Sequence, residues 1–247
     1  MDALLSIRNL TKGYTLGQRR IGVLHGLCLT VNPAEMVAIM GPSGSGKTTL
    51  LNCISGIDSP EAGEVVLFGK PVNYASEKDK TLLRRQHIGM VFQFFNLIPT
   101  LTVWDNVALP LMISKVPERV SLARVGDLLV QVGLGGRAQH YPFQLSGCEM
   151  QLVSIARALA HSPALLLADE PTGNVNPTVG RAIMDILRTT AKQQGTAIVL
   201  VTHSAEHAAW ADRVCFLKEG MIAKVHVQHG DKDAVSSIYE HLLSLGI

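Results

Sequence analysis

The sequence lacks any apolar stretch long enough to cross a membrane. A transmembrane helix needs about 20 consecutive apolar residues, whereas the longest apolar runs here, residues 164–168 and 197–201, are far shorter. Such runs are typical of strands buried inside a fold, although the mean hydropathy of the chain is positive. Residues 1–6 also lack the basic segment and long apolar core of a signal peptide, so we expect no secretion signal.

Closely spaced cysteine pairs and strongly basic tracts are missing as well. Cys28, Cys53, Cys148 and Cys215 show neither CxxC nor metal-ligand spacing, which predicts buried free thiols in a reducing compartment. The net charge is only +2 and no long tract of arginine and lysine is present, which argues against a nucleic-acid-binding protein. The densest basic segment, residues 78–85, contains an acidic residue and predicts a solvated helix face.

The composition that is present is that of a globular protein, with 47% apolar and 17% charged residues. Residues 5–10 and 23–31 alternate between apolar and polar side chains, which predicts half-buried strands. The continuous apolar run 36–40 predicts a strand buried on both faces, and residues 164–168 and 196–201 predict two more of the same kind.

Helical patterns account for much of the remaining chain. Helices are expected from residue 47 to about 55, over about 179–193, and over 234–245. Between residues 100 and 160 strand signals are absent and long helical patterns dominate, for example over 120–132. This contrast predicts a helical subdomain inserted into a core of strands and helices.

A glycine-rich phosphate-binding loop (P-loop) is the strongest motif. It has the pattern GxxxxGK[ST] and lies between a predicted buried strand and a predicted helix, as a P-loop requires. Glycines let the backbone N–H groups wrap closely around phosphate oxygens, and the helix N-terminus adds positive dipole character. The alternative, an ordinary glycine-rich surface turn, does not explain why every fixed position and both flanks match. The predicted nucleotide-binding residues here are Gly41, Pro42, Ser43, Gly44, Ser45, Gly46, Lys47, Thr48 and Thr49.

Lys47 and Thr48 are expected to have distinct roles in this loop. The lysine is placed to reach the β- and γ-phosphates, and the threonine hydroxyl to ligate Mg²⁺. Asp169 and Glu170 end a later apolar strand, where the carboxyl ends of parallel strands form a ligand-binding crevice. We expect Asp169 to hold Mg²⁺ and Glu170 to polarise the water that attacks the γ-phosphate. Without a P-loop, such an acidic pair is more often a solvated strand end.

Two further polar residues follow predicted strands and are predicted to take part in catalysis. His203 comes after residues 196–201 and is expected to contact the γ-phosphate, although a lone histidine at a strand end is more often structural. Gln93 follows a short apolar run and is expected to touch Mg²⁺ or the attacking water while linking the core to the helical insert. By itself Gln93 would be uninformative. The predicted catalytic set is therefore Glu170, His203, Gln93 and Lys47.

The predicted fold class is α/β, with a RecA-like P-loop core, a β-rich N-terminal subdomain and an inserted helical subdomain. We expect one domain. Its core comprises about 1–90 and 161–230, the helical subdomain about 91–160, and a C-terminal helix about 231–247.

These motifs, in this order and spacing, resemble those of the ABC transporter ATPases over essentially the whole chain. The P-loop, Gln93, the segment Leu145-Ser146-Gly147, the Asp169-Glu170 pair and His203 carry the resemblance. It implies an ATPase that uses ATP and Mg²⁺ and works with a membrane permease encoded as a separate chain. It also implies a head-to-tail dimer, in which Ser146 and Gly147 contact the phosphate bound by the other subunit.

The resemblance assigns one more nucleotide contact, because Tyr14 matches the aromatic residue on which the family stacks adenine. Stacking of this kind contributes roughly 1–3 kcal/mol. Without that context, an ordinary surface tyrosine would be the better interpretation.

Residues 40–52, 91–102 and 167–174 are similar to the lipoprotein-release and macrolide-export (LolD/MacB-type) branch. That branch implies export or extraction of a substrate, a peripheral location at the cytoplasmic face of the membrane, and a homodimer or heterodimer of ATP-binding subunits. It also implies that the segment after Gln93 faces the membrane subunit. Four apolar residues there form either a docking surface or part of the core, namely Phe94, Phe95, Leu97 and Ile98.

The family's LSGGQ signature is altered in this chain to Leu145-Ser146-Gly147-Cys148-Glu149, and Leu152 replaces a usual arginine. Cys148 adds a Cβ where the family leaves room for the backbone. At ~8 Å and an effective dielectric constant of ~20, the charge of Glu149 would repel a phosphate by roughly 2 kcal/mol. Milder departures are Ala34 for a turn glycine, Asn176 for an aspartate, and Ser204 for an acid after His203.

Two interpretations of these departures remain open. In the first, composite sites that use this signature turn over slowly, or the chain pairs with a subunit whose signature is intact. In the second, the changes are tolerated and the ATPase activity is ordinary. An ATP-binding adaptor with weak hydrolysis, as in cell-division complexes, is the main alternative function. A DNA-repair or translation ATPase is disfavoured because no second cassette, zinc module or coiled-coil insert is visible, and a simple P-loop kinase would not require Gln93, Ser146 and His203 together.

Overall fold

The computed structural model describes residues 3–228 and 233–247. Its strands are β1 (Leu5–Leu16), β2 (Arg19–Val31), β3 (Met36–Met40), β4 (Ala62–Leu67), β5 (Lys70–Pro71), β6 (Ile88–Val91), β7 (Leu165–Asp169), β8 (Ala197–Val201), β9 (Arg213–Lys218) and β10 (Met221–Val227). Its α-helices are α1 (Lys47–Ser55), α2 (Glu77–Gln86), α3 (Val103–Ile113), α4 (Glu118–Gln131), α5 (Gly147–Leu159), α6 (Pro177–Gln194), α7 (Ala205–Ala208) and α8 (Ala234–Leu245).

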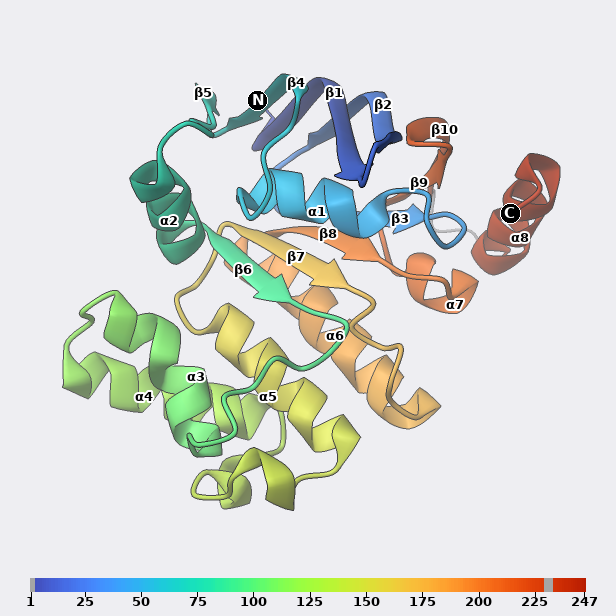
Figure 1. Cartoon of the computed structure of the whole chain (residues 1–247). Coiled ribbons are helices and arrows are strands. Elements are labelled where there is room, and N and C mark those ends of the chain that lie inside the picture. Colours follow the sequence, from blue (N-terminus) through green and yellow to red (C-terminus); the bar gives the residue numbers. More distant parts are fainter. Residues whose placement is uncertain (1–2, 229–232) are drawn as a thin grey trace.

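The strands form two sheets (Figure 1). A four-stranded antiparallel sheet has the order β2-β1-β4-β5, and a six-stranded sheet has the order β10-β9-β3-β8-β7-β6. In the second sheet, β9, β3, β8, β7 and β6 run parallel to their neighbours, while β10 is antiparallel to β9. The carboxyl ends of the parallel strands therefore meet at one edge, where α/β proteins bind ligands.

Two apolar cores lie on opposite faces of the six-stranded sheet. Helix α1 lies between the two sheets, and its apolar side chains pack with both of them (Figure 1). On the other face, the sheet packs against α3, α4, α5 and α6. The alternation within β3 shows the division, because Val37 and Ile39 belong to the first core while Met36, Ala38 and Met40 belong to the second. This explains why the strand is apolar throughout.

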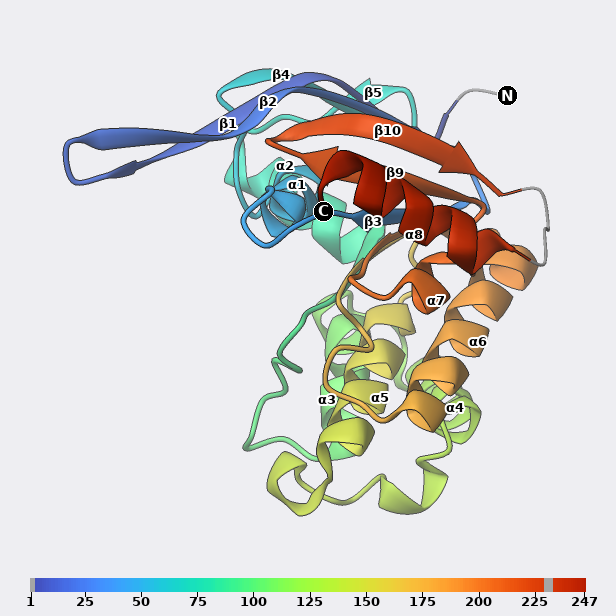
Figure 2. The same ribbon diagram turned by 90° about the vertical axis from the view of Figure 1, so that its right-hand side faces the viewer.

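The first two strands are longer than their sequence patterns predict. The expected strands 5–10 and 23–31 are extended into a hairpin that projects beyond the body of the molecule (Figure 2). Leu16 pairs with Arg19, so Gly17 and Gln18 form a two-residue loop, and Gly17 adopts φ +61°. Here the pairing of the two strands satisfies the backbone, so no alternation of buried side chains is needed.

The prediction of a solvated basic helix face over 78–85 is wrong for Lys80. Helix α2 forms there, but Lys80 is buried. Its aliphatic stem lies over Gly56, while its ammonium group pairs with Glu77 at 2.6 Å. Arg84 also turns inward, since its Nη1 donates to the carbonyl of Gly56 at 2.9 Å. Long basic side chains can cover apolar surface in this way while keeping the charge paired.

Residues 103–159 contain α3, α4, α5 and two short 3₁₀ turns, with no strand among them in the described structure. The predicted helix over 234–245 is confirmed as α8, but its expected start near 231 and the predicted end of the core near 230 lie outside the described residues. Residues 1–2 of the segment inspected for a signal peptide also lie outside them. None of the helices in the described part of the chain combines the length and apolar character that a membrane crossing requires.

The turn before β3 provides a stability prediction. Ala34 has φ +59°, and Glu35 N–H closes the turn onto the carbonyl of Asn32 at 3.2 Å. The left-handed region costs an alanine roughly 1–2 kcal/mol, while glycine loses more backbone entropy on folding. We expect Ala34→Gly to raise the free energy of unfolding by roughly 0.5–1 kcal/mol, measured by thermal and denaturant unfolding. Ala75→Gly, in a turn without positive φ, is the control and should be neutral or destabilising.

Candidate nucleotide-binding site

A cavity of about 460 Å³ lies at the carboxyl edge of the parallel strands. Its lining combines the P-loop and α1 with residues that follow three different strands. The lining residues are Val23, Ser43, Gly44, Gly46, Lys47, Thr48, Thr49, Gln93, Glu170 and His203. The structure thus brings together most of the residues predicted from sequence, although they are up to 160 positions apart in the chain, from Ser43 to His203.

Close packing around the P-loop explains two of its glycines. A Cβ on Gly41 would lie 2.1 Å from the carbonyl oxygen of Leu217, and one on Gly46 would lie 2.8 Å from Cδ2 of Leu24. Gly46 also has φ +105°, which side chains rarely allow. Gly41, Pro42 and Ser45 do not line the cavity themselves. They form the part of the loop behind it, in which Ser45 N–H donates to the Pro42 carbonyl at 3.2 Å.

Lys47 is held inside the loop. Its Nζ donates to the carbonyl oxygens of Gly41 at 2.8 Å and Pro42 at 2.9 Å. Burial lowers the pKa of Lys47, and the charges of Glu170 and Asp169 oppose that shift. The ammonium group of Lys47 therefore lies in the wall of the cavity, within the electrostatic reach of the Glu170 and Asp169 carboxylates.

Thr48 and Asp169 meet beneath the cavity. The Thr48 hydroxyl donates to Oδ2 of Asp169 at 2.8 Å, although 121 positions separate the two residues. Burial raises the pKa of Asp169, with the hydrogen bond from Thr48 acting against the shift. One hydroxyl and one carboxylate oxygen are thus paired at the end of β7.

Glu170 occupies the centre of the polar cluster. Its Oε1 lies 2.6 Å from Nε2 of His203, and its Oε2 accepts from Nε2 of Gln93 at 3.5 Å. The backbone of Glu170 has φ +48°, and its N–H donates to the carbonyl of Val201 at 3.0 Å. The strand-end turn is therefore held in a sparsely populated conformation that aims the carboxylate at the cavity.

Asn174 and Val23 lie at the site although neither was predicted to be a site residue. The side-chain amide of Asn174 donates to the carbonyl of Gln93 at 3.0 Å and so connects the segment after β7 with the segment after β6. Val23 lines the cavity from β2. Neither residue type signals such a role by itself, because only the tertiary arrangement brings these segments together.

Tyr14 lies beside the site rather than in its lining. Its ring is 41% exposed, and its hydroxyl donates to Oδ2 of Asp58 at 2.7 Å. Burial raises the pKa of Tyr14, and a hydrogen bond with the side chain of Thr49, a cavity residue, acts in the opposite direction. Tyr14 therefore flanks the cavity on the side of α1.

The signature residues do not line the cavity of their own chain. Ser146 is the N-cap of α5, and Gly147 is the first residue of that helix. Ser146 N–H and its hydroxyl both donate to Oε2 of Glu149 at 2.8 Å, while Oε1 of Glu149 lies 3.3 Å from Nε of Arg137. The Ser146 bonds lower the pKa of Glu149. Arg137 partly offsets the Glu149 charge, so the roughly 2 kcal/mol repulsion expected for an unpaired carboxylate is an upper value.

Two other departures have local structural explanations. Asn176 is the N-cap of α6 and accepts from Val179 N–H at 2.9 Å, a role that asparagine and aspartate fill equally well. Its amide also donates to Sγ of Cys148 at 3.8 Å, so two altered positions contact each other. Ser204 caps α7 by accepting from His207 N–H at 3.1 Å. Leu152 is half-buried on α5 and packs against the larger apolar core, a contact that an apolar side chain makes there.

Comparison with known proteins agrees with this geometry. A family model described as ABC transporter matches residues 24–173, which include the P-loop, Gln93, the signature and the acidic pair. The chain belongs to the ABC transporter family. An uncharacterised ABC transporter ATP-binding protein of Mycobacterium tuberculosis is 44% identical over 219 residues, covering 89% of this chain and 88% of the relative. The lipoprotein-releasing system ATP-binding protein LolD of Pseudomonas fluorescens is 43% identical over 223 residues, covering 90% of this chain and 98% of the relative.

Solved ABC structures share the fold. The ATP-binding cassette MJ0796, solved as a dimer bound to ADP and Pi, has a TM-score of 0.87 at 38% identity, covering 92% of this chain and all of that one. CbiO1 of Clostridium perfringens, part of the ABC transporter complex cbiONQ, has a TM-score of 0.83 at 28% identity, covering 100% of this chain and 95% of that one. The predicted α/β P-loop fold and the family resemblance are confirmed. This ABC protein binds and hydrolyses ATP as the ATPase subunit of a transporter and works with membrane permease components.

Proposed function

We propose that this subunit powers the export or extraction of a substrate by a separate membrane permease, to which it binds at the cytoplasmic face. The relatives named as lipoprotein-releasing ATP-binding proteins support this branch. The observation that carries the proposal is an apolar groove beside Gln93, next to the helix that begins at the signature. A transporter ATPase needs such a surface to receive movement or transmit it.

Magnesium and a triphosphate fit the residues present. Thr48 and Asp169 supply a hydroxyl and a carboxylate already 2.8 Å apart, and Gln93 adds an amide, which are the hard oxygen donors that Mg²⁺ prefers. Gly44 and Gly46 line the cavity, so no side chain at these two positions separates the loop backbone from a bound phosphate. The bound metal would neutralise phosphate charge. Lys47 exchanges its carbonyl partners for the β- and γ-phosphate oxygens, and the loop N–H groups orient the triphosphate.

Glu170 is placed to act on the attacking water. Its Oε1 is oriented by His203 and its Oε2 by Gln93, so the carboxylate holds a fixed position from which to accept the proton of that water. His203 then lies next to the transferred phosphoryl group. Positioning and charge neutralisation dominate phosphoryl transfer, and this cluster provides both.

A second ATP-binding subunit completes each site. Ser146 and Gly147 begin α5 and are absent from the lining of the cavity in their own chain. The helix N-terminus with its N–H groups is suited to binding an anion, such as a phosphate presented by another chain. A head-to-tail dimer would bring these parts together, either from two copies of this chain or from this chain and a related subunit, and the solved dimeric cassette supports that arrangement.

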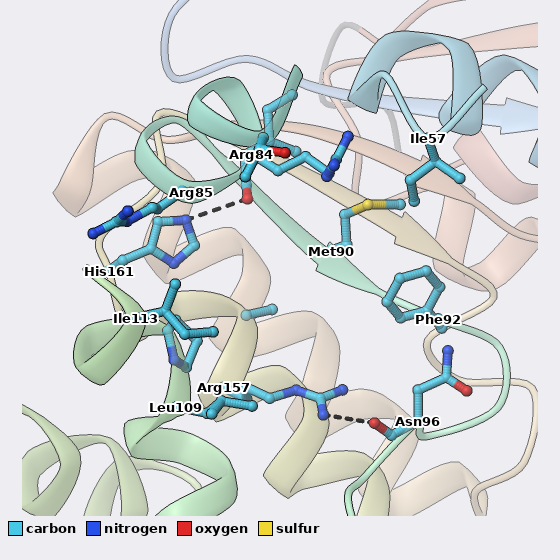
Figure 3. A pocket seen from close by; sticks show the side chains of 14 residues that line it. Ile57, Arg84, Arg85, Met90, Phe92, Asn96, Leu109, Ile113, Arg157 and His161 are labelled. Carbon is cyan, nitrogen blue, oxygen red and sulfur yellow. Dashed lines mark hydrogen bonds between the residues drawn. The ribbon is translucent and has the colours of Figure 1, made fainter. Parts of the chain in front are cut away.

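The groove has a volume of about 470 Å³ and lies between β6, α2, α3 and α5 (Figure 3). Met90 and Phe92 line one side, with Leu109 and Ile113 on the other. Of the four residues predicted as a docking surface, Phe94 is 70% and Ile98 37% exposed, whereas Leu97 packs against the core and Phe95 is half-buried. None of the four lines the groove, so we place the docking site beside them rather than on them.

Charge defines which segment the groove accepts. Among the residues that the structure describes, its lining includes Arg84, Arg85 and Arg157 and no carboxylate. Arg157 donates to the carbonyl oxygens of Asn96 at 2.6 Å and Phe95 at 3.0 Å, and burial lowers its pKa. A short permease helix with an apolar face and an acidic side chain would match this lining. Because Arg157 lies on α5, this contact also connects the groove to the signature, and we propose that residues of about 91–160 transmit the movement.

A charge placed in the groove tests this function. Ile113, 55% exposed, is replaced by Asp, and the control is Val130→Asp on α4, where Val130 is 72% exposed and outside the groove. We expect Ile113→Asp to reduce, at least about tenfold, both the amount of permease recovered with the subunit in mild detergent and the permease-dependent change in ATPase rate. Basal ATPase activity should stay the same in both variants. Equal permease recovery with Ile113→Asp and Val130→Asp would contradict the docking site.

Reversion of the signature separates the two interpretations of its changes. If the altered signature slows the composite site, Cys148→Gly with Glu149→Gln should raise the ATPase rate and ATP-driven dimerisation. Since Arg137 already offsets part of the Glu149 charge, we expect a rise of only about threefold to tenfold. Rate assays and size-exclusion chromatography with ATP measure it. Cys28→Gly is the control, because Cys28 is far from the signature in sequence and is exposed, so the prediction of a buried thiol is wrong for this cysteine. Unchanged rate and dimerisation would show that the changes are tolerated.

A further inference from the structure

Tyr14 belongs to a cluster of three side chains that the ATPase chemistry leaves unexplained. The two carboxylate oxygens of Asp58 have different partners. Oδ2 accepts the Tyr14 hydroxyl at 2.7 Å, and Oδ1 pairs with Nζ of Lys12 at 2.6 Å. The same lysine Nζ lies over the Tyr14 ring, 4.9 Å from its centroid. One carboxylate therefore fixes both the tip of the ring and the cation that covers one of its faces.

Asp58 is itself rigidly connected to the helix that follows the P-loop. Its N–H donates to the carbonyl of Asn52 on α1 at 3.1 Å, and its Oδ1 accepts from Ser59 N–H at 2.7 Å. Lys12 is only 12% exposed and donates to the Ser59 carbonyl at 2.9 Å as well. The position of the Tyr14 ring relative to the P-loop is thus set through α1.

The charges in this cluster are mutually stabilised. Burial opposes ionisation of both groups, yet the hydrogen bond and charge of Lys12 hold the pKa of Asp58 below its ordinary range. Burial likewise opposes the charge of Lys12, while Asp58 keeps the pKa of that lysine raised. Both groups therefore stay charged at neutral pH, so the cation over the ring and the acceptor for the Tyr14 hydroxyl persist together.

We propose that Asp58 is a positioning residue for the nucleobase, because it orients Tyr14 and, through Lys12, leaves only the opposite ring face for stacking. The inference rests on the proposed ATP-binding function and on the adenine-stacking role that the family resemblance assigns to Tyr14. A tyrosine on a projecting hairpin with 41% exposure would lose rotamer freedom when a base stacked on it. The Asp58 hydrogen bond removes that freedom before the nucleotide binds. Asp58 therefore raises the affinity for the base although its own side chain does not touch the base.

The competing explanation is purely structural, since the same contacts also attach the β1–β2 hairpin to α1. The two explanations differ in which part of the nucleotide they affect. Loss of a base platform weakens binding of ATP but not of tripolyphosphate, which carries no base. Displacement of α1 would disturb the P-loop and weaken binding of both.

The test measures dissociation constants of Mg-ATP and Mg-tripolyphosphate by calorimetry for Asp58→Asn, Tyr14→Phe, their double variant and Tyr14→Ala. We expect Asp58→Asn and Tyr14→Phe each to weaken ATP binding about threefold to tenfold, less than Tyr14→Ala, with tripolyphosphate binding unchanged. Asp58→Asn leaves one acceptor oxygen for the two partners Lys12 and the Tyr14 hydroxyl, and Tyr14→Phe removes the same hydroxyl contact. The double variant should therefore be no weaker than the stronger single one. Asp185→Asn on α6, an exposed carboxylate outside the cavity, is the matched control and should bind both ligands as the parent does.

Three outcomes would overturn the inference, and they have different consequences for the proposed function. If Tyr14→Ala weakens ATP binding and Asp58→Asn does not, Tyr14 keeps its role and only the positioning role of Asp58 is wrong. Equal losses of ATP and tripolyphosphate affinity in Asp58→Asn would establish a structural role instead. Unchanged ATP affinity in Tyr14→Ala would refute base stacking on Tyr14 and the inference with it, while leaving the P-loop assignments intact.

Discussion

Replacing Glu170 by Gln is expected to slow ATP hydrolysis by at least about 100-fold while leaving ATP binding intact. The amide has the shape of the carboxylate and can still accept a hydrogen bond from His203, which lies 2.6 Å from Glu170 in the parent. It cannot accept the proton of the attacking water. The chain should therefore accumulate as an ATP-bound dimer, because closure by ATP is kept and release by hydrolysis is lost.

Two measurements check this expectation. The steady-state ATPase rate gives the loss of turnover, and size-exclusion chromatography with Mg-ATP gives the dimer fraction. Glu240→Gln on α8, an exposed position outside the cavity, is the matched control and should hydrolyse ATP as the parent does. A Glu170→Gln variant that turns over at the parental rate would rule out Glu170 as the base.

Lys47→Ala is expected to act one step earlier and to weaken binding of Mg-ATP by about 100-fold. A hydrogen bond to a charged group contributes roughly 1.5–3 kcal/mol, and Lys47 is placed to make such bonds to two phosphates. The substitution also removes the bonds from Nζ to the carbonyls of Gly41 and Pro42, so the P-loop loses an internal brace. Hydrolysis should fall in proportion to occupancy.

Calorimetry of Mg-ATP binding and the rise in melting temperature on adding nucleotide measure this effect. Lys192→Ala on α6, where the lysine pairs with Asp212 outside the cavity, is the control and should bind ATP normally. The melting temperature without nucleotide separates loss of the ligand contact from loss of the brace. Parental affinity in Lys47→Ala would contradict the placement of the triphosphate in the P-loop, and with it the proposed roles of Thr48 and Asp169.

The two variants together distinguish binding from chemistry within one cavity. Lys47 lies at the start of α1 and Glu170 directly after β7, yet the charge of Glu170 acts to raise the pKa of Lys47 against the effect of burial. If Lys47→Ala loses ATP binding and Glu170→Gln retains it, the role of Lys47 in binding and the role of Glu170 in hydrolysis are separate.

Much of the candidate site follows from local sequence because its parts sit at strand ends. Gln93, Asp169 and His203 each follow a short apolar run, and parallel strands carry such residues to a common edge. The P-loop is also a local structure, since glycines and a helix start are enough to define it. These residues were predictable because their positions depend on periodicity and turn chemistry more than on distant contacts.

Contacts between distant segments account for what the sequence did not reveal. Burial of Lys80 depends on Gly56, which comes 24 positions earlier. The balance of charge at Glu149 depends on Arg137, and the extent of the β1–β2 hairpin depends on pairing rather than on an apolar pattern. A sequence pattern indicates which face of a helix or strand is apolar. It does not indicate which distant side chain will contact a given polar side chain.

By itself, the sequence placed a P-loop, an acidic pair and a histidine at one edge of a parallel sheet, because chain-local motifs and the geometry of strand ends suffice for that. The order and spacing of these motifs then carried the resemblance to the ABC transporter ATPases. The tertiary structure alone decided the rest. It surrounded Tyr14 with Asp58 and Lys12, paired Glu149 with Arg137, and formed a basic, apolar groove from four separate elements. Side-chain charge pairing and groove shape act over a few ångströms in space, and only the folded chain brings those groups within that distance.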